Sequence, residues 1–180
     1  YETLETFAQI NPPIRDKYHQ DQLWIALKEG TIGMVVTDHA PHLVSEKEQP
    51  FGMAPSGMPG VDTSLSLMLT QANNGRCSVV DVARWMSNSP AQYFGIENKG
   101  FLEEGYDADI AIVDLKGRAR VSGRSSFSKC GWSAFDQWDI QGIPLMTIVN
   151  GQIVYREGDI QAFKKTPAKE VSLKSTPVKA

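Results

Sequence analysis

Apolar residues near the start of the chain follow first a helical and then a strand-like spacing. Residues 22–29 carry a broad apolar face and stop at Gly30, which predicts a helix. The run 32–37 that follows is short, apolar and rich in β-branched residues, as is typical of a buried parallel strand. A helix followed by such a strand indicates the alternation of a parallel α/β sheet or barrel.

The middle of the chain predicts a long loop followed by helices. Residues 39–61 hold four prolines and three glycines, and long ordered loops in compact domains are usually functional. Apolar spacing predicts a helix over 63–72. A capping box at 78–81 begins another, which the Asn-Ser-Pro sequence at 88–90 is expected to break before a short helix through Tyr93 and Phe94.

From Gly100 onward the spacing becomes that of strands. Residues 110–113 predict a strand, and 147–155 predict a hairpin whose Asn150-Gly151 turn favours type I′. We therefore expect one α/β domain over 1–99 and a small β unit over 100–160. The Lys-, Pro-, Ser- and Thr-rich segment 161–180 has little to bury and is predicted to be disordered.

Composition narrows the class of protein. The 180 residues carry a formal net charge of -3, which argues against a nucleic-acid partner. Apolar runs fall well short of the roughly 18 residues that span a bilayer, so no membrane association is predicted. Cys77 and Cys130 form no paired framework, which favours a cytoplasmic protein with buried or half-buried thiols. Tyr1 stands where an initiator methionine is expected, which suggests a fragment.

A carboxylate directly follows the predicted strand, in the sequence Thr-Asp-His-Ala-Pro-His at 37–42. Barrel enzymes keep catalytic groups at the carboxyl ends of their strands, and a divalent metal compensates the cost of a carboxylate there. Such a carboxylate can also act as a general base. The spacing is equally compatible with Asp38 capping a turn and the histidines lying on the surface.

Several motifs together closely resemble those of bacterial dihydroorotases, in the same order and spacing over roughly residues 1–160. The resemblance is carried by Asn-Pro-Pro-Ile-Arg at 11–15, the Thr-Asp-His-Ala-Pro-His motif, Glu-Lys at 46–47, Pro-Phe-Gly-Met-Ala-Pro-Ser-Gly-Met-Pro-Gly-Val at 50–61, Ser-Lys-Cys-Gly-Trp-Ser at 128–133 and Val-Asn-Gly at 149–151. Any one of these motifs would be weak by itself, whereas the set is highly specific.

The resemblance implies a fold class and a reaction. Members are similar to other amidohydrolases, with an eight-stranded TIM barrel, a metal centre and a small β-sandwich. The expected fold class is therefore α/β: 1–99 would be the C-terminal part of the barrel, with its last strands and helices, and 100–160 a β-sandwich unit. The implied reaction is the reversible hydrolysis of dihydroorotate to N-carbamoyl-L-aspartate in pyrimidine biosynthesis, at two zinc ions.

The resemblance also implies roles for individual residues. Asp38 would be a metal ligand and the catalytic proton carrier, and His42 would bind the substrate carboxylate. Asn11 would hydrogen-bond the substrate, and the backbone of Pro59 and Gly60 would contact the ring amide. Of the remaining candidates, His39 is expected to support its neighbours and His19 to lie on the solvated surface. The charged run 46–48 is expected to be a solvated loop face.

The sequence departs from the dihydroorotase pattern in what it lacks. The His-x-His pair, the bridging carboxylated lysine and two further metal histidines of that pattern are absent, and a TIM barrel needs roughly 250 residues. We expect the isolated chain to be inactive and prone to misfolding, because a zinc site needs about three or four protein ligands. Two alternatives stay open: a hydantoinase, dihydropyrimidinase or allantoinase relative, and a non-catalytic partner of aspartate transcarbamoylase. Association into a homodimer also stays open.

Overall fold

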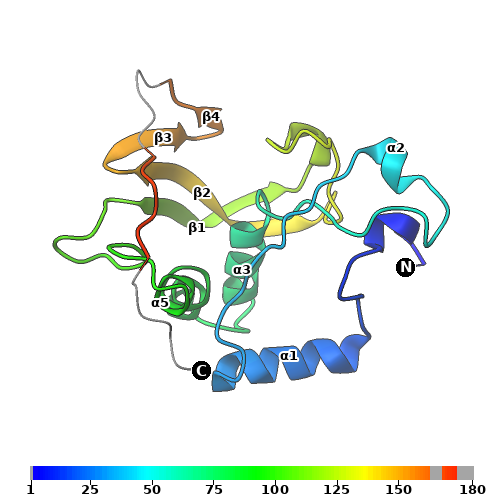
Figure 1. Cartoon of the computed structure of the whole chain (residues 1–180), viewed down its shortest axis with the longest axis horizontal. Helices are drawn as coiled ribbons and strands as arrows, with labels where there is room; N and C mark the ends of the chain where they lie inside the picture. The colour runs from blue at the N-terminus through cyan, green and yellow to red at the C-terminus, as the bar shows by residue number, and fades with distance from the viewer. Residues whose placement is uncertain (1, 163–167, 174–180) are drawn as a thin grey trace. The chain divides into compact units, whose positions relative to one another are not determined.

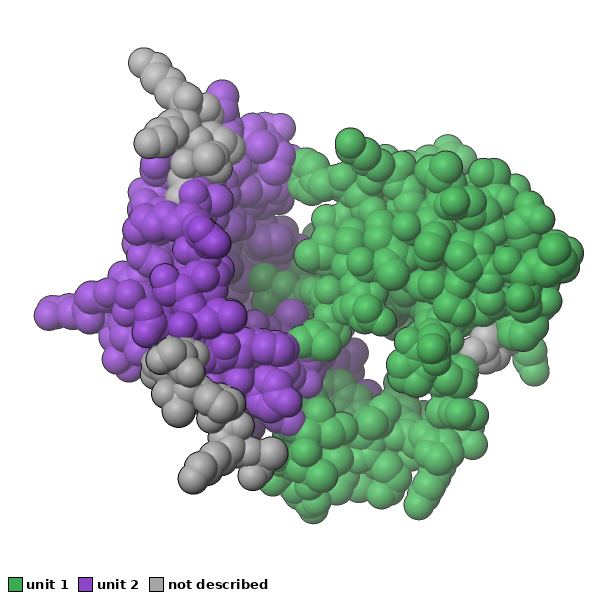
Figure 2. Space-filling model, in the orientation of Figure 1, with its two compact units in different colours: residues 1–32, 36–67, 118–140 green, residues 33–35, 68–117, 141–180 purple. Residues whose placement is uncertain are grey.

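The computed structural model describes residues 2–162 and 168–173, which form two compact units interleaved along the chain (Figures 1 and 2). Unit 1 takes in residues 1–32, 36–67 and 118–140, and unit 2 takes in 33–35, 68–117 and 141–180. The predicted division into domains at residue 99 stays a prediction.

Unit 1 carries one long helix. The 3-10 helix η1 (Glu5–Ala8) precedes α1 (Lys17–Glu29), and the unit also holds the short elements α2 (Val44–Lys47) and η3 (Gly123–Ser125). Helix α1 begins earlier than predicted because the Asp16 carboxylate caps it, accepting a hydrogen bond from the backbone N–H of His19 at 3.2 Å. It ends at Gly30, which has a φ of 84°. The predicted helix is confirmed, although the side chain of Leu23 is 57% exposed.

The core of unit 1 lies around Trp132. Cys130, Trp132 and Ala134 are buried together, and Phe7 and Met58 pack against them. The rings of Phe7 and Trp132 meet edge to face with centroids 4.9 Å apart, a favoured aromatic geometry. This cluster joins η1, the loop at 58 and the 130–134 segment into one packed body.

The strand predicted over 32–37 is not formed. No described strand pairs with it, and a parallel strand needs neighbours to hydrogen-bond with. The chain instead reaches Asp38, whose φ is 43°, and makes a single parallel bridge between His39 and Met58. The prediction is wrong because an apolar pattern is local, whereas the pairing of a strand depends on residues outside that pattern.

Unit 2 contains a series of helices, of which the last three follow one another without a break. Helix α3 (Ser64–Asn73), most of which lies in this unit, confirms the helix predicted there, and α4 (Val79–Ala83) begins at the predicted capping box of Ser78 and Asp81. The π-helical turn η2 (Arg84–Asn88) leads directly into α5 (Ser89–Tyr93).

The predicted break at 88–90 is therefore wrong. Pro90 falls in the first turn of α5, and the wider π turn directly before it keeps the backbone helical through the proline. Trp85 in this turn is only 2% exposed and is among the largest fully buried side chains of the molecule.

Four strands form one sheet in the order β1-β2-β3-β4 (Figure 1). They are β1 (Ile110–Arg120), β2 (Asp139–Val149), β3 (Gln152–Arg156) and β4 (Asp159–Ile160). The β2–β3 hairpin is antiparallel, and its turn residues Asn150 and Gly151 have φ of 46° and 76°, as a type I′ turn requires. The predicted hairpin is confirmed.

Helix α3 packs closely on β2. A Cβ at Gly142 would lie 2.5 Å from the Cβ of Leu69, so only glycine allows this approach. The backbone N–H of Gln141 donates to the Thr70 hydroxyl at 2.9 Å. Helix and sheet therefore form a single layered core in unit 2.

The C-terminal segment and the cysteines complete the comparison with prediction. Residues 168–173 of the predicted disordered tail include an isolated bridge between Leu173 and Ile96, whereas 163–167 and 174–180 lie outside the described residues. Cys130 is buried and Cys77 half-buried, as predicted. Across the described residues, no helix combines the length and apolarity needed to cross a membrane.

Candidate active site

Two segments of unit 1, residues 37–42 and 56–61, are hydrogen-bonded to each other. The backbone N–H of Ala40 donates to the carbonyl of Met58 at 3.1 Å, next to the bridge between His39 and Met58. Two residues after Ala40, His42 Nε2 lies 3.2 Å from the carbonyl oxygen of Ser56, which is two residues before Met58. Residues 37–42 and 56–61 therefore form one local site.

His39 fixes this pairing with its side chain. Its Nδ1 atom accepts hydrogen bonds from the backbone N–H groups of Gly60 at 3.0 Å and of Val61 at 3.3 Å. Because an accepting Nδ1 carries no proton, the neutral ring holds its hydrogen on Nε2. The His39 ring thus holds the backbone of Gly60 and Val61, and its expected supporting role in the site stays a prediction.

Two glycines let the segments approach each other. A Cβ at Gly57, whose φ is 139°, would lie 2.6 Å from the carbonyl oxygen of Ala40 and 2.8 Å from its Cβ. At Gly60 it would lie 3.3 Å from the carbonyl oxygen of Thr37. Close contact of backbone with backbone explains both glycines of this loop motif.

Asp38 lies exposed between these paired residues. Its carboxylate accepts no hydrogen bond from any other described residue, and its backbone has a positive φ, which is uncommon outside glycine. A free carboxylate is a suitable ligand for a divalent cation. Within 2–162 and 168–173, however, no group of three or more His, Cys, Asp or Glu side chains could hold a metal ion. The described residues by themselves therefore do not form a complete metal site.

His42 is half-buried and its backbone is anchored. The indole Nε1–H of Trp132 donates to the carbonyl of His42 at 2.8 Å. Its ring Nδ1 lies 3.9 Å from the carboxylate of Glu46, which also accepts the backbone N–H of Leu43 at 2.7 Å. These contacts orient a donor imidazole on the same segment as Asp38.

Asn11 is exposed on a third segment, which Gln9 ties to the loop. The carbonyl of Gln9 accepts the backbone N–H of Gly57 at 3.0 Å, and its side-chain oxygen accepts that of Gly52 at 3.0 Å. The structure therefore brings the segments of all five predicted site residues together within unit 1: Asn11, Asp38, His42, Pro59 and Gly60. The role of each stays a prediction.

The expected solvated face at 46–48 is wrong for Lys47. Its side chain is 0% exposed, and its Nζ donates to the carbonyls of Gln9 at 3.1 Å, Pro55 at 2.8 Å and Gly57 at 3.1 Å. Burial lowers the pKa of the Lys47 ammonium below its ordinary value. A lysine between two glutamates gives no local sign of burial, so the sequence pattern did not reveal this contact.

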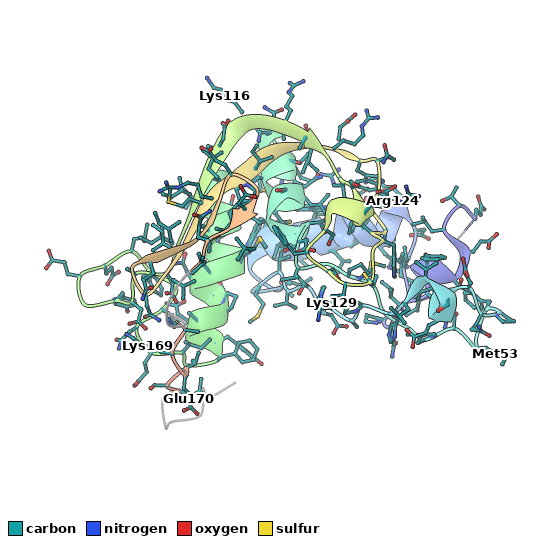
Figure 3. All side chains as sticks on the ribbon, turned by 90° about the horizontal axis from the view of Figure 1, so that it is seen from above. Met53, Lys116, Arg124, Lys129, Lys169 and Glu170 are labelled. Atoms are coloured by element: carbon teal, nitrogen blue, oxygen red, sulfur yellow. The ribbon has the colours of Figure 1, made fainter. Side chains whose placement is uncertain are left out.

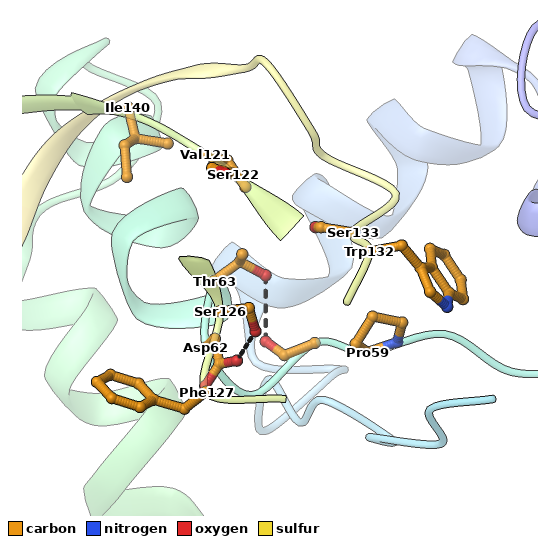
Figure 4. Close-up of a pocket in the computed structure, with 11 residues that line it drawn as sticks. Pro59, Asp62, Thr63, Val121, Ser122, Ser126, Phe127, Trp132, Ser133 and Ile140 are labelled. Atoms are coloured by element: carbon orange, nitrogen blue, oxygen red, sulfur yellow. Dashed lines mark hydrogen bonds between the residues drawn. The ribbon is translucent and has the colours of Figure 1, made fainter. Parts of the chain in front are cut away.

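A small cavity of about 160 Å³ adjoins Pro59 and Gly60 (Figure 4). On its wall the Asp62 carboxylate accepts hydrogen bonds from the Ser126 hydroxyl and, at 3.0 Å, from the backbone N–H of Ser128. In the neighbouring loop, by contrast, Met53 is 74% exposed and its side chain projects outward (Figure 3). The loop is thus anchored around Pro59 and Gly60 and exposed around Met53.

Comparison with known proteins identifies the family. The sequence model of the Amidohydrolase family matches residues 17–154. The chain belongs to the amidohydrolase family. Dihydroorotase of Methanosphaera stadtmanae is 34% identical over 91% of this chain and 37% of its own length, and dihydroorotase of Halobacterium salinarum is 38% identical over 89% and 38%. The predicted resemblance to dihydroorotases is confirmed.

Solved structures confirm the predicted fold class for this amidohydrolase chain. The L-hydantoinase (dihydropyrimidinase) from Arthrobacter aurescens matches with a TM-score of 0.85 and 33% identity, over 89% of this chain and 37% of its own. A D-hydantoinase (dihydropyrimidinase) from Thermus sp. matches with a TM-score of 0.83 and 29% identity, over 88% and 36%. The chain is α/β and corresponds to part of the amidohydrolase fold, and it spans little more than a third of the length of these relatives.

Proposed function

We propose that this chain supplies part of the active site of a dihydroorotase, which hydrolyses dihydroorotate reversibly to N-carbamoyl-L-aspartate in pyrimidine biosynthesis. The observation that carries the proposal is the hydrogen-bonded pairing of residues 37–42 with 56–61. It gathers a free carboxylate, an anchored imidazole and a glycine-containing loop on one local surface. Dihydroorotases that match about nine-tenths of the chain support the same reaction.

In this proposal each residue acts on a particular part of the reaction. Asp38 takes the proton from the oxygen that attacks the ring carbonyl and passes it to the leaving ring nitrogen as the C–N bond breaks. His42 and the Asn11 side chain hold the carboxylate and ring of the substrate, and the backbone at Pro59 and Gly60 contacts the ring amide. The amidohydrolase family implies a metal cofactor. We propose zinc, for which Asp38 would be one ligand while the others lie outside the described residues.

A graft tests the proposed activity. The stretch of the Methanosphaera stadtmanae dihydroorotase that this chain matches is replaced by the chain, and turnover of dihydroorotate is measured. We expect turnover in the graft and none in the relative from which that stretch is deleted, because the chain restores the Asp38 segment and its loop. A graft that folds with bound metal but leaves dihydroorotate unchanged would contradict the proposal.

The structural likeness to hydantoinases supports a second candidate, a hydantoinase-like hydrolase, and His42 separates the two. In the graft, His42→Ala is expected to raise the KM for dihydroorotate about tenfold, because a hydrogen bond to a charged group contributes about 1.5 kcal/mol or more. Turnover of hydantoin, which has no carboxylate, should not change. His19→Ala, on the exposed surface, is the matched control. An unchanged KM for dihydroorotate would favour the hydantoinase candidate.

Other aspects of the proposal concern partners and location. A homodimer, a complex with aspartate transcarbamoylase and a cytoplasmic location stay predictions. The catalytic candidate is preferred over the non-catalytic partner because Asp38, His42 and Asn11 are all retained. Binding of aspartate transcarbamoylase to a graft that has no turnover would favour the non-catalytic alternative.

A further inference from the structure

Lys47 is a buried cation surrounded by backbone oxygen. Its side chain has no exposed surface, and its three ammonium hydrogens match three carbonyl acceptors, those of Gln9, Pro55 and Gly57, at 2.8 to 3.1 Å. No carboxylate lies among these partners. A buried charge without a counter-ion is costly unless its hydrogen bonds are complete, and here they are.

The three carbonyls belong to two separate segments. Gln9 lies two residues before Asn11, whereas Pro55 and Gly57 lie in the long loop shortly before Pro59 and Gly60. The same two segments are joined directly by the backbone hydrogen bond from Gly57 N–H to the carbonyl of Gln9. The Lys47 ammonium thus links the backbone at Gln9 to the backbone at Pro55 and Gly57, next to this hydrogen bond.

The backbone of Lys47 is held in place by its own hydrogen bonds, so its side chain projects from a fixed position. Its carbonyl accepts a hydrogen bond from the hydroxyl of Thr6, another buried residue, and its N–H donates to the carbonyl of Leu43 at 3.1 Å. Lys47 ends α2, which begins directly after the His42–Leu43 corner. One residue therefore connects the His42 segment, the Asn11 segment and the Pro59–Gly60 loop.

We infer that Lys47 is a positioning residue that sets the spacing between the Asn11 segment and the 55–60 loop, and through them the substrate-binding geometry. It touches none of the proposed reacting groups, so it acts through the backbone that it holds. The inference rests on the proposed function where it concerns substrate, but the bridge itself does not depend on any activity. An ammonium matters here because it supplies three donors at one point.

The test replaces Lys47 by methionine, which keeps the length and apolar stem of the side chain but removes all three donors. Amide hydrogen exchange is measured on the complete chain at Gly57, whose N–H is bonded to Gln9, and at Val82 in α4 as an internal measure of folding. We expect exchange at Gly57 to speed up about tenfold or more while Val82 keeps its protection. Lys47→Gln, with two donors on a shorter side chain, should restore part of the protection, and Lys28→Met on the exposed face of α1 should change neither amide.

The kinetic arm uses the dihydroorotase graft carrying the same variants. Lys47→Met is expected to raise the KM for dihydroorotate about tenfold and to change kcat about twofold or less, because substrate contacts move while Asp38 does not. Partial recovery of KM in Lys47→Gln supports positioning over a general loss of stability.

Hydrogen exchange tests the Lys47 bridge, whereas the kinetics of the graft also depend on the proposed function. If Gly57 exchanges equally fast in the wild type and in Lys47→Met, or if Lys47→Gln recovers neither protection nor KM, the inference is overturned. If Lys47→Met also loses protection at Val82, the variant has lost folding more widely. The test then rests on Lys47→Gln, whose exchange rate at Gly57 is compared with that of the wild type. Loss of Gly57 protection in a graft that never turns over dihydroorotate would support the bridge and contradict only the proposed function.

Discussion

Replacing Asp38 by asparagine in the dihydroorotase graft is expected to lower kcat for dihydroorotate by a factor of roughly 10² to 10⁴, the usual contribution of a positioned acid–base group. Asparagine keeps the size of the side chain and one oxygen but cannot carry the proton from the attacking oxygen to the leaving nitrogen. Since the Asp38 side chain forms no hydrogen bond with any described residue, the substitution should leave folding unchanged. Steady-state kinetics and thermal unfolding of the same preparation check both statements.

The control for this substitution is Asp21→Asn. Asp21 forms an exposed ion pair with Lys17 on α1 and should have no effect on kcat. Metal content provides a second measurement, since loss of one ligand weakens metal binding. Asp38→Asn with full kcat, in a graft whose wild type is active, would remove Asp38 from the proposed mechanism.

The sequence predicted most of the local structure where the signal is itself local. The Ser78–Asp81 capping box, the Asn150-Gly151 turn and the apolar spacing of α3 each depend on residues within a few positions of one another. Their geometry is therefore set by short-range sterics and hydrogen bonds. The site residues were found by a different route, through motifs whose order and spacing resemble those of dihydroorotases.

The predictions that the structure overturns concern features that short sequence patterns do not determine. The strand expected at 32–37 needs partner strands, which no pattern within 32–37 specifies. The backbone through Pro90 stays helical because a π turn precedes the proline. Burial of Lys47 depends on three carbonyls, one of them 38 residues away in sequence. Long-range contacts of this kind decide how the site is held together, although short motifs decide which residues are in it.

The pairing that carries the proposed function also predicts a large effect for Gly57→Ala. The substitution places a Cβ 2.6 Å from the carbonyl oxygen of Ala40, in a backbone conformation with φ of 139° that side chains rarely adopt. Strain of this kind and overpacking each cost about 1 to 3 kcal/mol. Since the contact is with backbone, relief requires the loop to move away from residues 37–42. We expect kcat/KM of the graft to fall roughly a hundredfold, as loss of about 3 kcal/mol of transition-state stabilisation implies.

Gly52→Ala distinguishes the effect of the close contact with Ala40 from the effect of a positive φ. Gly52 lies in the same loop with φ of 86°, but a Cβ there meets nothing within 4 Å. It should therefore lose stability from backbone strain alone and keep most of its kcat/KM, whereas Gly57→Ala loses both. Urea unfolding and kinetics of the two variants, measured side by side, make the comparison. Equal losses of kcat/KM would mean that the approach of the loop to Ala40 does not determine the geometry of the site, and the pairing of the two segments would then no longer support the proposed function.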